Sequence, residues 1–313
     1  MSMKKYISNI FLYLKRVFQE FSADNILKYS ASLAYYTVFS IAPLLVIVTA
    51  LLGRFFGKEA VQGQIYQQLS HLIGSVAALQ IQDTIKNIHL NHNNYLATVI
   101  SIVILFIGAT TIFGEVQDSL NKIWGLKIKP KKVWWKLIIT RLLSFSLILS
   151  IGAILIISFV LNALLTAFGD LISNYLKNYS SYFMAVTGAI LSIMVTGFLF
   201  SLLFKILPDA KIKWKDVLLG GFVTAIFFTL GKMGIGYYIG KSKLSSLYGA
   251  AGSIIIFMVW VYYSSVILYL GAEFTKVHAK LYGYNIIPNE YAEWVETEEK
   301  TVSQPQLKNK DLH

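Results

Sequence analysis

The sequence has no cysteine and few charged residues, and both absences narrow the class of protein. Without cysteine there are no disulfide bonds, thiolate metal sites or cysteine nucleophiles. Charged residues make up only 14% of the 313 residues, whereas soluble domains have about a quarter. Hydrophobic residues make up 56%, which is more apolar surface than one soluble core can bury. The composition therefore predicts an integral membrane protein.

Long uncharged stretches predict an all-α fold with six transmembrane helices, because a helix needs about 20 apolar residues to cross a bilayer. The predicted spans are residues 29–53, 95–114, 142–169, 178–204, 217–240 and 244–272. The fifth span is unusual, since Lys232 interrupts it and it holds six glycines. These features are typical of a broken helix at a transport site. The alternative is that Lys232 reaches the membrane surface while Gly236 and Gly240 permit close helix packing.

The distribution of basic residues predicts the orientation of the six spans. The N-terminal segment, the tail and two alternate connections hold 21 Lys and Arg, against 7 on the opposite side. By the positive-inside rule both termini are then cytoplasmic. Residues 1–28 have the spacing of an amphipathic interfacial helix, and they precede a membrane domain over 29–281. We expect surface helices in the outer loop between the first two spans and a disordered acidic tail over 282–313. We also expect the first span to be retained, because it does not look like a signal peptide.

Several motifs resemble one family in their order along the chain. They are Ala31–Pro43 (ASLAYYTVFSIAP), Gln117–Gly125 (QDSLNKIWG), Leu207–Ala210 (LPDA), Gly249–Ser253 (GAAGS), Trp260–Ser264 (WVYYS) and Gly271–Thr275 (GAEFT). Over roughly residues 5–282 the chain resembles the YihY/BrkB family of bacterial inner-membrane proteins. The resemblance implies a six-helix, multi-pass protein of the inner (plasma) membrane, often described as a transporter or virulence factor. The family's older label, ribonuclease BN, is generally regarded as misassigned, and the family supplies no agreed site residues.

The first predicted span carries a polar stripe. Ser32, Tyr36, Ser40 and Pro43 share one face of the helix, and Pro43 leaves the carbonyl of Phe39 without its helical donor. In lipid such groups find partners inside the protein. The stripe indicates either a kinked helix that lines a polar path or ordinary helix packing through small and hydroxyl residues.

Glu115, Asp118 and Glu273 are candidate ion-binding residues. They lie at the ends of the second and sixth spans, which both reach the cytoplasmic side, and carboxylates there can bind or relay cations and protons. The alternative is an ordinary interfacial charge, or an ion pair with Lys122 or Lys276. Lys232 can meet an anionic substrate. The basic segment Lys127–Lys136 fits a lipid-phosphate site or an aromatic belt with positive-inside charge equally well.

These residues favour transport of an ion or an anionic, lipid-like substrate. A non-enzymatic envelope scaffold is the second hypothesis, because a sequence does not reveal partners. A ribonuclease is the third, and it lacks the clustered carboxylates or histidines that metal-dependent hydrolysis needs. We expect no enzymatic activity, catalytic residue, cofactor or bound metal. Membrane lipids are the expected partners, nucleic acid is not, and a homo-oligomer is left open.

Overall fold

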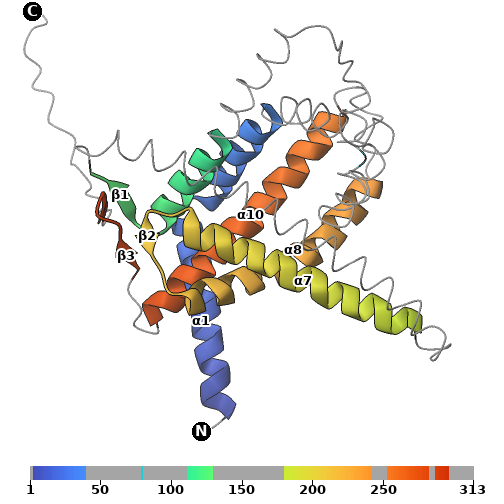
Figure 1. Ribbon diagram of the computed structural model, residues 1–313, viewed down its shortest axis with the longest axis horizontal. Coiled ribbons are helices and arrows are strands. Elements are labelled where there is room, and N and C mark those ends of the chain that lie inside the picture. The colour runs from blue at the N-terminus through green and yellow to red at the C-terminus, as the bar shows by residue number, and fades with distance from the viewer. Residues whose placement is uncertain are drawn as a thin grey trace, which may run out of the picture.

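The described part of the chain is a set of long helices with two short β-ribbons at one end (Figure 1). The structure is a computed structural model, and it describes residues 3–39, 79, 111–129, 180–241, 252–281 and 286–295. Its elements are α1 (Met3–Ala23), β1 (Leu126–Ile128), α7 (Ser180–Ile206), β2 (Ala210–Lys211), α8 (Trp214–Lys241), α10 (Gly252–Leu281), β3 (Ile287–Pro288) and β4 (Ala292–Trp294). Residues 26–39 and 111–123 are also helical.

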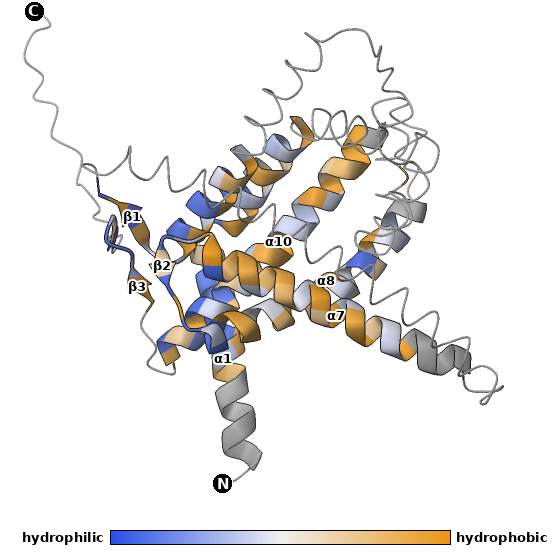
Figure 2. Ribbon diagram, viewed as in Figure 1, coloured by the Kyte–Doolittle hydropathy of each residue, from blue (hydrophilic) through white to orange (hydrophobic). Residues whose placement is uncertain are grey.

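Three of the described helices are long and apolar enough to cross a membrane. These stretches are Val186–Ile206 in α7, Trp214–Tyr238 in α8 and Ile254–Leu281 in α10, and hydrophobic colour runs along most of α7 and α10 in Figure 2. The first two agree with the spans predicted over 178–204 and 217–240. The span predicted over 142–169 lies outside the described residues, and so does most of those over 29–53 and 95–114.

The helix that contains the sixth predicted span is longer than that span at its C-terminal end. We expect it to stop at Ala272, before Glu273, but α10 continues without a break to Leu281. A single carboxylate does not end the helix because Lys276, on the same face one turn later, lies beside it.

The interpretation of the fifth span as a broken helix is wrong. α8 is one continuous helix through Lys232 and all of its glycines. Gly220, Gly221 and Gly231 lie against side chains of neighbouring helices, and a β-carbon at any of them would overlap its neighbour. Close packing through small residues therefore explains these three. It does not explain Gly236, where an added β-carbon would meet no atom of the described chain within 4 Å.

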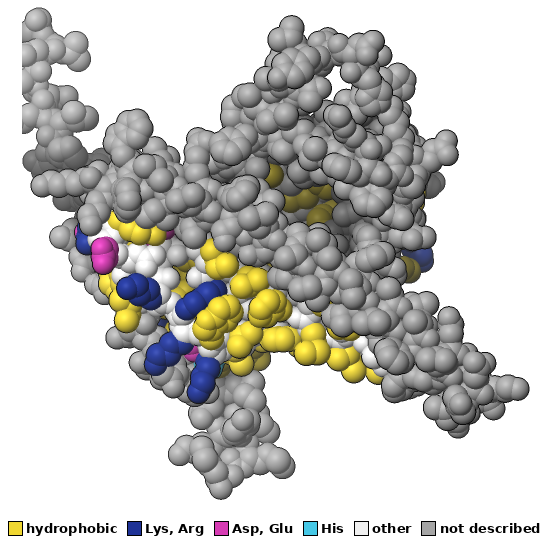
Figure 3. All heavy atoms as spheres, in the orientation of Figure 1, with side chains coloured by type: hydrophobic (Ala, Val, Ile, Leu, Met, Phe, Trp, Pro, Cys, Tyr) yellow, Lys and Arg dark blue, Asp and Glu magenta, His cyan; other side chains and the backbone are white. Residues whose placement is uncertain are grey.

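The largest hydrophobic core lies at the end of the bundle that carries the strands. It joins helix 111–123, the end of α7, the start of α8 and the last turns of α10. Trp124, which is fully buried, donates a hydrogen bond from Nε1 to the carbonyl of Ala272 at 3.1 Å. On the outer surface, hydrophobic side chains cover α7 while Lys and Arg gather near the strands (Figure 3). In the described part of the chain, the end that carries the lysines thus also holds a well-packed core.

The chain after α10 is not disordered over residues 286–295, which corrects our prediction for this part of the tail. β4 pairs antiparallel with β1, with Trp294 opposite Leu126, and β3 pairs antiparallel with β2. Ile286 and Ala292 are buried, and this apolar anchorage outweighs the acidic composition of the surrounding sequence. The described part of the chain is therefore mostly helical with two small two-stranded sheets, rather than all-α.

Asp209 joins this ribbon to helix 111–123. Its carboxylate is fully buried and accepts hydrogen bonds from Gln117 Nε2 at 2.9 Å and Asn121 Nδ2 at 2.7 Å. Its backbone amide donates to Asn121 Oδ1, and its carbonyl accepts from the amide of Asn289. One residue thus fixes a helix, a turn and the C-terminal segment to each other.

We expect Asp209→Asn to lower the free energy of unfolding by about 1.5–3 kcal/mol, because the new amide group cannot accept from both Gln117 and Asn121. Thermal unfolding of the full chain in detergent micelles measures the effect. Glu293→Gln, an exposed substitution on β4, is the control. Equal stability of both variants would contradict the role given to Asp209.

Candidate functional site

The polar stripe of the first span is only partly within the described residues. Ser32 is half-buried and Tyr36 is exposed, whereas Ser40 and Pro43 lie outside the described chain. The ring of Tyr36 packs edge-on against Tyr35 at 5.7 Å between centroids. The interpretation of this stripe as a polar path stays a prediction.

The charged candidates lie in different surroundings. Glu273 is fully buried, Glu115 is half-buried and Asp118 is exposed. Lys232 is half-buried on α8, in a stretch where Met233 is 70% exposed. Of these four residues, the structure places Glu273 in a charged cluster and Asp118 in a cleft that meets this cluster.

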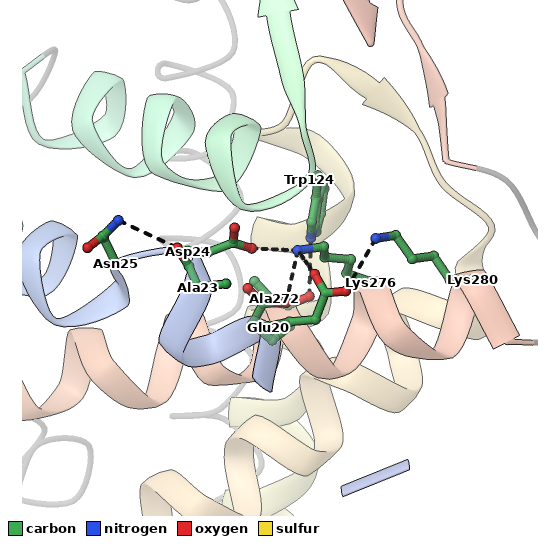
Figure 4. A network of polar contacts seen from close by, with 9 residues as sticks. Glu20, Ala23, Asp24, Asn25, Trp124, Ala272, Lys276 and Lys280 are labelled. Carbon is green, nitrogen blue, oxygen red and sulfur yellow. Dashed lines mark hydrogen bonds and ion pairs between the residues drawn. The ribbon is translucent and has the colours of Figure 1, made fainter. Parts of the chain in front are cut away.

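The cluster consists of Glu20, Asp24, Glu273, Lys276 and Lys280, and we call it the Lys276 cluster. Figure 4 shows Glu20, Asp24, Lys276 and Lys280 of this cluster. The Lys276 ammonium lies 2.5 Å from Glu20 Oε2, 2.5 Å from Asp24 Oδ2 and 3.4 Å from Glu273 Oε2. Lys280 lies 3.6 Å from the other oxygen of Glu20. Three carboxylates therefore share one buried ammonium at the junction of α1 and α10.

Local sequence positions each of these groups. Glu20 and Asp24 are four residues apart at the end of α1, so they point to the same side of the helix. Asn25 has a φ of 53°, the left-handed conformation that commonly ends a helix, and the next helix starts at residue 26. Tyr13 and Val17 dock α1 on α10, where the Tyr13 hydroxyl donates to the carbonyl of Phe274 at 2.8 Å.

Glu273 is the most deeply buried member of the cluster. It is 0% exposed, and no group in the described chain donates a hydrogen bond to either of its carboxylate oxygens. A buried carboxylate costs free energy unless it is paired, and its nearest described cation, Lys276, is closer to Glu20 and Asp24. The position therefore favours the uptake of one more cation, either a proton or a metal ion.

The cluster has the donor set of a metal site but already contains a cation. One oxygen from each of Glu20, Asp24 and Glu273 lies within 4.8 Å of the others, and such hard oxygen ligands suit Mg²⁺ or Ca²⁺. The ammonium of Lys276 lies within contact distance of all three carboxylates. A metal ion bound there would have to displace the Lys276 side chain.

The pKa of Glu20 shows how strongly the two neighbouring lysines affect a carboxyl group of the cluster. Burial works to raise its pKa, but hydrogen bonds and charge from Lys276 and Lys280 outweigh burial, so the pKa lies below the ordinary value of 4.5. A lowered carboxyl pKa means that this contact stabilises the fold fully above about pH 4.5. The stabilisation is lost as the pH falls through the lowered pKa of the folded protein.

A cleft of about 1050 Å³ meets the cluster at Asp24, and we call it the Asp24 cleft. It lies where α1, helix 26–39, helix 111–123 and β1 come together. Its lining residues are Ala23, Asp24, Asn25, Tyr29, Asp118, Asn121, Lys122, Gly125, Leu126, Lys127, Ile128 and Val295. Among the described residues, Asp24 alone lines the cleft and also binds Lys276.

Sequence reasoning missed Glu20 and Asp24, because it assigned them to the polar face of an interfacial helix. The available signal was the pair of acidic residues four apart in front of the first span. Sequence reasoning also missed a second polar contact between distant segments, a hydrogen bond of 2.9 Å between Asp216 Oδ1 and His278 Nδ1. Both sites depend on contacts between segments far apart in the sequence.

Comparison with known proteins agrees with the order of the sequence motifs. The family model described as "Virulence factor BrkB" matches residues 17–289. The chain belongs to the BrkB family. This match extends from α1 to β3, so it includes every residue of the Lys276 cluster.

Curated relatives are membrane proteins. The chain is 24% identical to a UPF0761 membrane protein of Saccharophagus degradans, covering 89% of this chain and 62% of the relative. It is 28% identical to one of Pseudoalteromonas atlantica, covering 81% of each, and 26% identical to one of Ralstonia nicotianae, covering 80% of this chain and 54% of the relative. The chain thus spans little more than half the length of some relatives. No solved structure matches.

Together, the family and the three span-length helices establish this BrkB protein as an integral membrane protein.

Proposed function

We propose that this BrkB protein is a transporter of the bacterial inner membrane that moves an ion or a phosphate-bearing, lipid-like substrate, and is no enzyme. In this proposal the chain has six spans, and both termini lie in the cytoplasm. One observation carries the proposal: fully buried Glu273, in a helix long enough to span a membrane, shares the ammonium of Lys276 with Glu20 and Asp24.

Burying such a cluster in a membrane protein costs free energy, and this cost supports a functional reason for the cluster. Ionisable residues within spans are rare, face the protein interior and commonly mark ion pathways or proton relays. Replacing an ion network by apolar side chains of similar size is often neutral or stabilising. Stability alone therefore gives little reason to place three carboxylates around one lysine.

The geometry also suggests how the cluster responds to a cation. Lys276 holds α1 against α10 because two of its carboxylate partners, Glu20 and Asp24, belong to the end of α1. A proton or metal ion taken up by the carboxylates weakens their attraction for the ammonium. The junction between α1 and α10 then has two arrangements whose populations depend on the bound cation.

The test is a flux measurement with purified protein in liposomes. Entrapped pyranine reports proton flux under an imposed potential, and a fluorescent short-chain phospholipid reports movement between leaflets. We expect flux above that of empty vesicles. We expect Glu273→Gln to reduce it at least about tenfold, equivalent to about 1.4 kcal/mol, because a neutral amide cannot exchange a proton or attract a cation.

Glu293→Gln is the matched control, since it makes the same chemical change at an exposed position on β4. Its flux should equal that of the original chain. Vesicles that show no flux of either probe across varied gradients would count against transport. Flux that survives Glu273→Gln would remove the cluster from the transport path.

A further inference from the structure

The Asp24 cleft combines charges of both signs on one lining. Lys122 and Lys127 contribute two ammonium groups, and Asp24 and Asp118 contribute two carboxylates. Lys122, Lys127 and Asp118 are exposed, whereas Asp24 is half-buried. The cleft has the size of a site for a small organic ligand, so its charge pattern decides which ligand it suits.

The backbone turns that shape the cleft are fixed. Gly125 has a φ of 67° and ends helix 111–123, which brings Lys122 and Lys127 to either side of the turn. A β-carbon at Gly125 would lie 3.3 Å from the carbonyl oxygen of Val295. The amide of Val295 also donates to the carbonyl of Gly125 at 2.8 Å. The C-terminal segment thus completes this wall.

The basic part of the lining has an ordered arrangement. The ammonium of Lys122 lies 5.2 Å from the centroid of the Tyr29 ring, within the range of a cation–π contact. Lys122 and Lys127, on either side of the turn at Gly125, suit a phosphate group.

The acidic part of the lining excludes a ligand that is only an anion. Asp24 and Asp118 would repel a second negative group, just as Lys122 and Lys127 would repel a ligand that is only a cation. A ligand that carries both charges pairs with both halves. Because Asp24 also binds Lys276 at 2.5 Å, the amine of such a ligand would compete with Lys276 for this carboxylate.

We propose that the Asp24 cleft binds a molecule with a phosphate group and a primary amine on a short linker. The phosphate contacts Lys122 and Lys127, and the amine contacts Asp118 and Asp24. This deepens the proposed function by naming the substrate class, and it rests on that function only for movement across the membrane. A phosphoethanolamine lipid headgroup and free phosphoethanolamine share this chemistry.

Isothermal titration of the full chain in a neutral detergent tests the ligand class. We expect phosphoethanolamine to bind roughly tenfold or more tightly than ethanolamine or inorganic phosphate, since each of these forms only one set of charged hydrogen bonds. Dihexanoyl phosphatidylethanolamine, below its micelle concentration, separates the two sources. Tighter binding than free phosphoethanolamine indicates a lipid headgroup, and weaker binding indicates a soluble ligand.

Variants locate the ligand. Lys122→Gln and Asp118→Asn should each weaken phosphoethanolamine binding roughly tenfold. Lys129→Gln is the matched control: Lys129 follows β1, has the same charge, bonds to the carbonyl of Glu290 and does not line the cleft. Its affinity should be unchanged. Gel filtration and thermal melting confirm that each variant is folded.

Several results would overturn this proposal. They are absence of binding, equal affinity for inorganic phosphate or for ethanolamine, and equal weakening by Lys129→Gln, which would indicate a nonspecific basic surface. The flux measurement is independent. Binding without flux would contradict transport and leave the cleft assignment intact, whereas flux without binding would contradict the cleft assignment alone.

Discussion

Replacing Gly220 by alanine is expected to lower the free energy of unfolding by about 1–3 kcal/mol. A β-carbon at this position would overlap the Thr275 hydroxyl and lie 3.1 Å from Thr275 Cβ and 3.2 Å from the carbonyl oxygen of Gly271. Thr275 cannot easily move away, because it is buried and its hydroxyl donates to that same carbonyl at 3.0 Å. The added β-carbon would therefore strain the packing at the point where α8 crosses α10.

The same crossing has a second, reciprocal contact. A β-carbon at Gly271 of α10 would overlap the hydroxyl of Thr224 on α8, so Gly271→Ala should destabilise similarly. The two helices thus approach each other through a glycine on each side. Small residues are the usual means of close helix packing in membranes, where burial of apolar surface gives no driving force.

Gly234→Ala on α8 is the matched control. No atom of the described chain lies within 4 Å of an added β-carbon there, and alanine favours the helix by up to about 1 kcal/mol over glycine. The two alanine substitutions in α8 should therefore shift stability in opposite directions. Thermal unfolding followed by circular dichroism in detergent measures both. A Gly220→Ala protein as stable as the original chain would show that α8 and α10 are farther apart than described.

Lys276→Met is the second substitution with a large expected effect, a loss of about 3–5 kcal/mol, because it removes the ammonium shared by three carboxylates. Glu273 suffers most, since it is fully buried and Lys276 is its described cation. Methionine keeps much of the volume of lysine, so the loss reports charge rather than packing. The melting temperature of the full chain in detergent at pH 7 measures the effect.

Three comparisons isolate the cause of this loss. Lys280→Met should cost less than about 1 kcal/mol, because the Lys280 side chain is 55% exposed and lies 3.6 Å from Glu20. The double variant Lys276→Met with Glu273→Met should recover part of the loss, since it also removes the buried carboxyl group that has lost its nearest described cation. The defect of the single variant should also shrink toward pH 4, where protonation relieves repulsion among the carboxylates. A defect that is independent of pH would point to packing instead.

The sequence alone was sufficient to predict the class of protein, the family and the position of α7. These predictions depend on the length of the apolar stretches and on the order of the motifs along the chain. The sequence did not predict that α10 continues past Glu273 to Leu281. In the fold, Glu273 pairs with Lys276 in the next turn and lies close to Glu20 and Asp24. A periodicity rule does not contain such a contact, because α1 and α10 are more than two hundred residues apart in the sequence.

The candidate site was therefore predicted only in part. Glu273 and Asp118 stood out as carboxylates near span ends, and Lys276 was recognised as an available partner. Glu20 and Asp24 did not stand out, since acidic residues on an amphipathic helix are normally solvated. Their role depends on the turn at Asn25 and on the docking of Tyr13 and Val17 against α10, which are tertiary features.

The pairing of β1 with β4 has a consequence for biosynthesis. Leu126 lies opposite Trp294, so the ribosome has to synthesise the chain as far as residue 294 before this ribbon can close. The hydrophobic helices emerge earlier and can enter the bilayer first. Closure of the C-terminal segment over Gly125 and Asp209 is then a late step in maturation. A nascent chain stalled before residue 286 would have its helices inserted while the wall formed by Val295 is still missing.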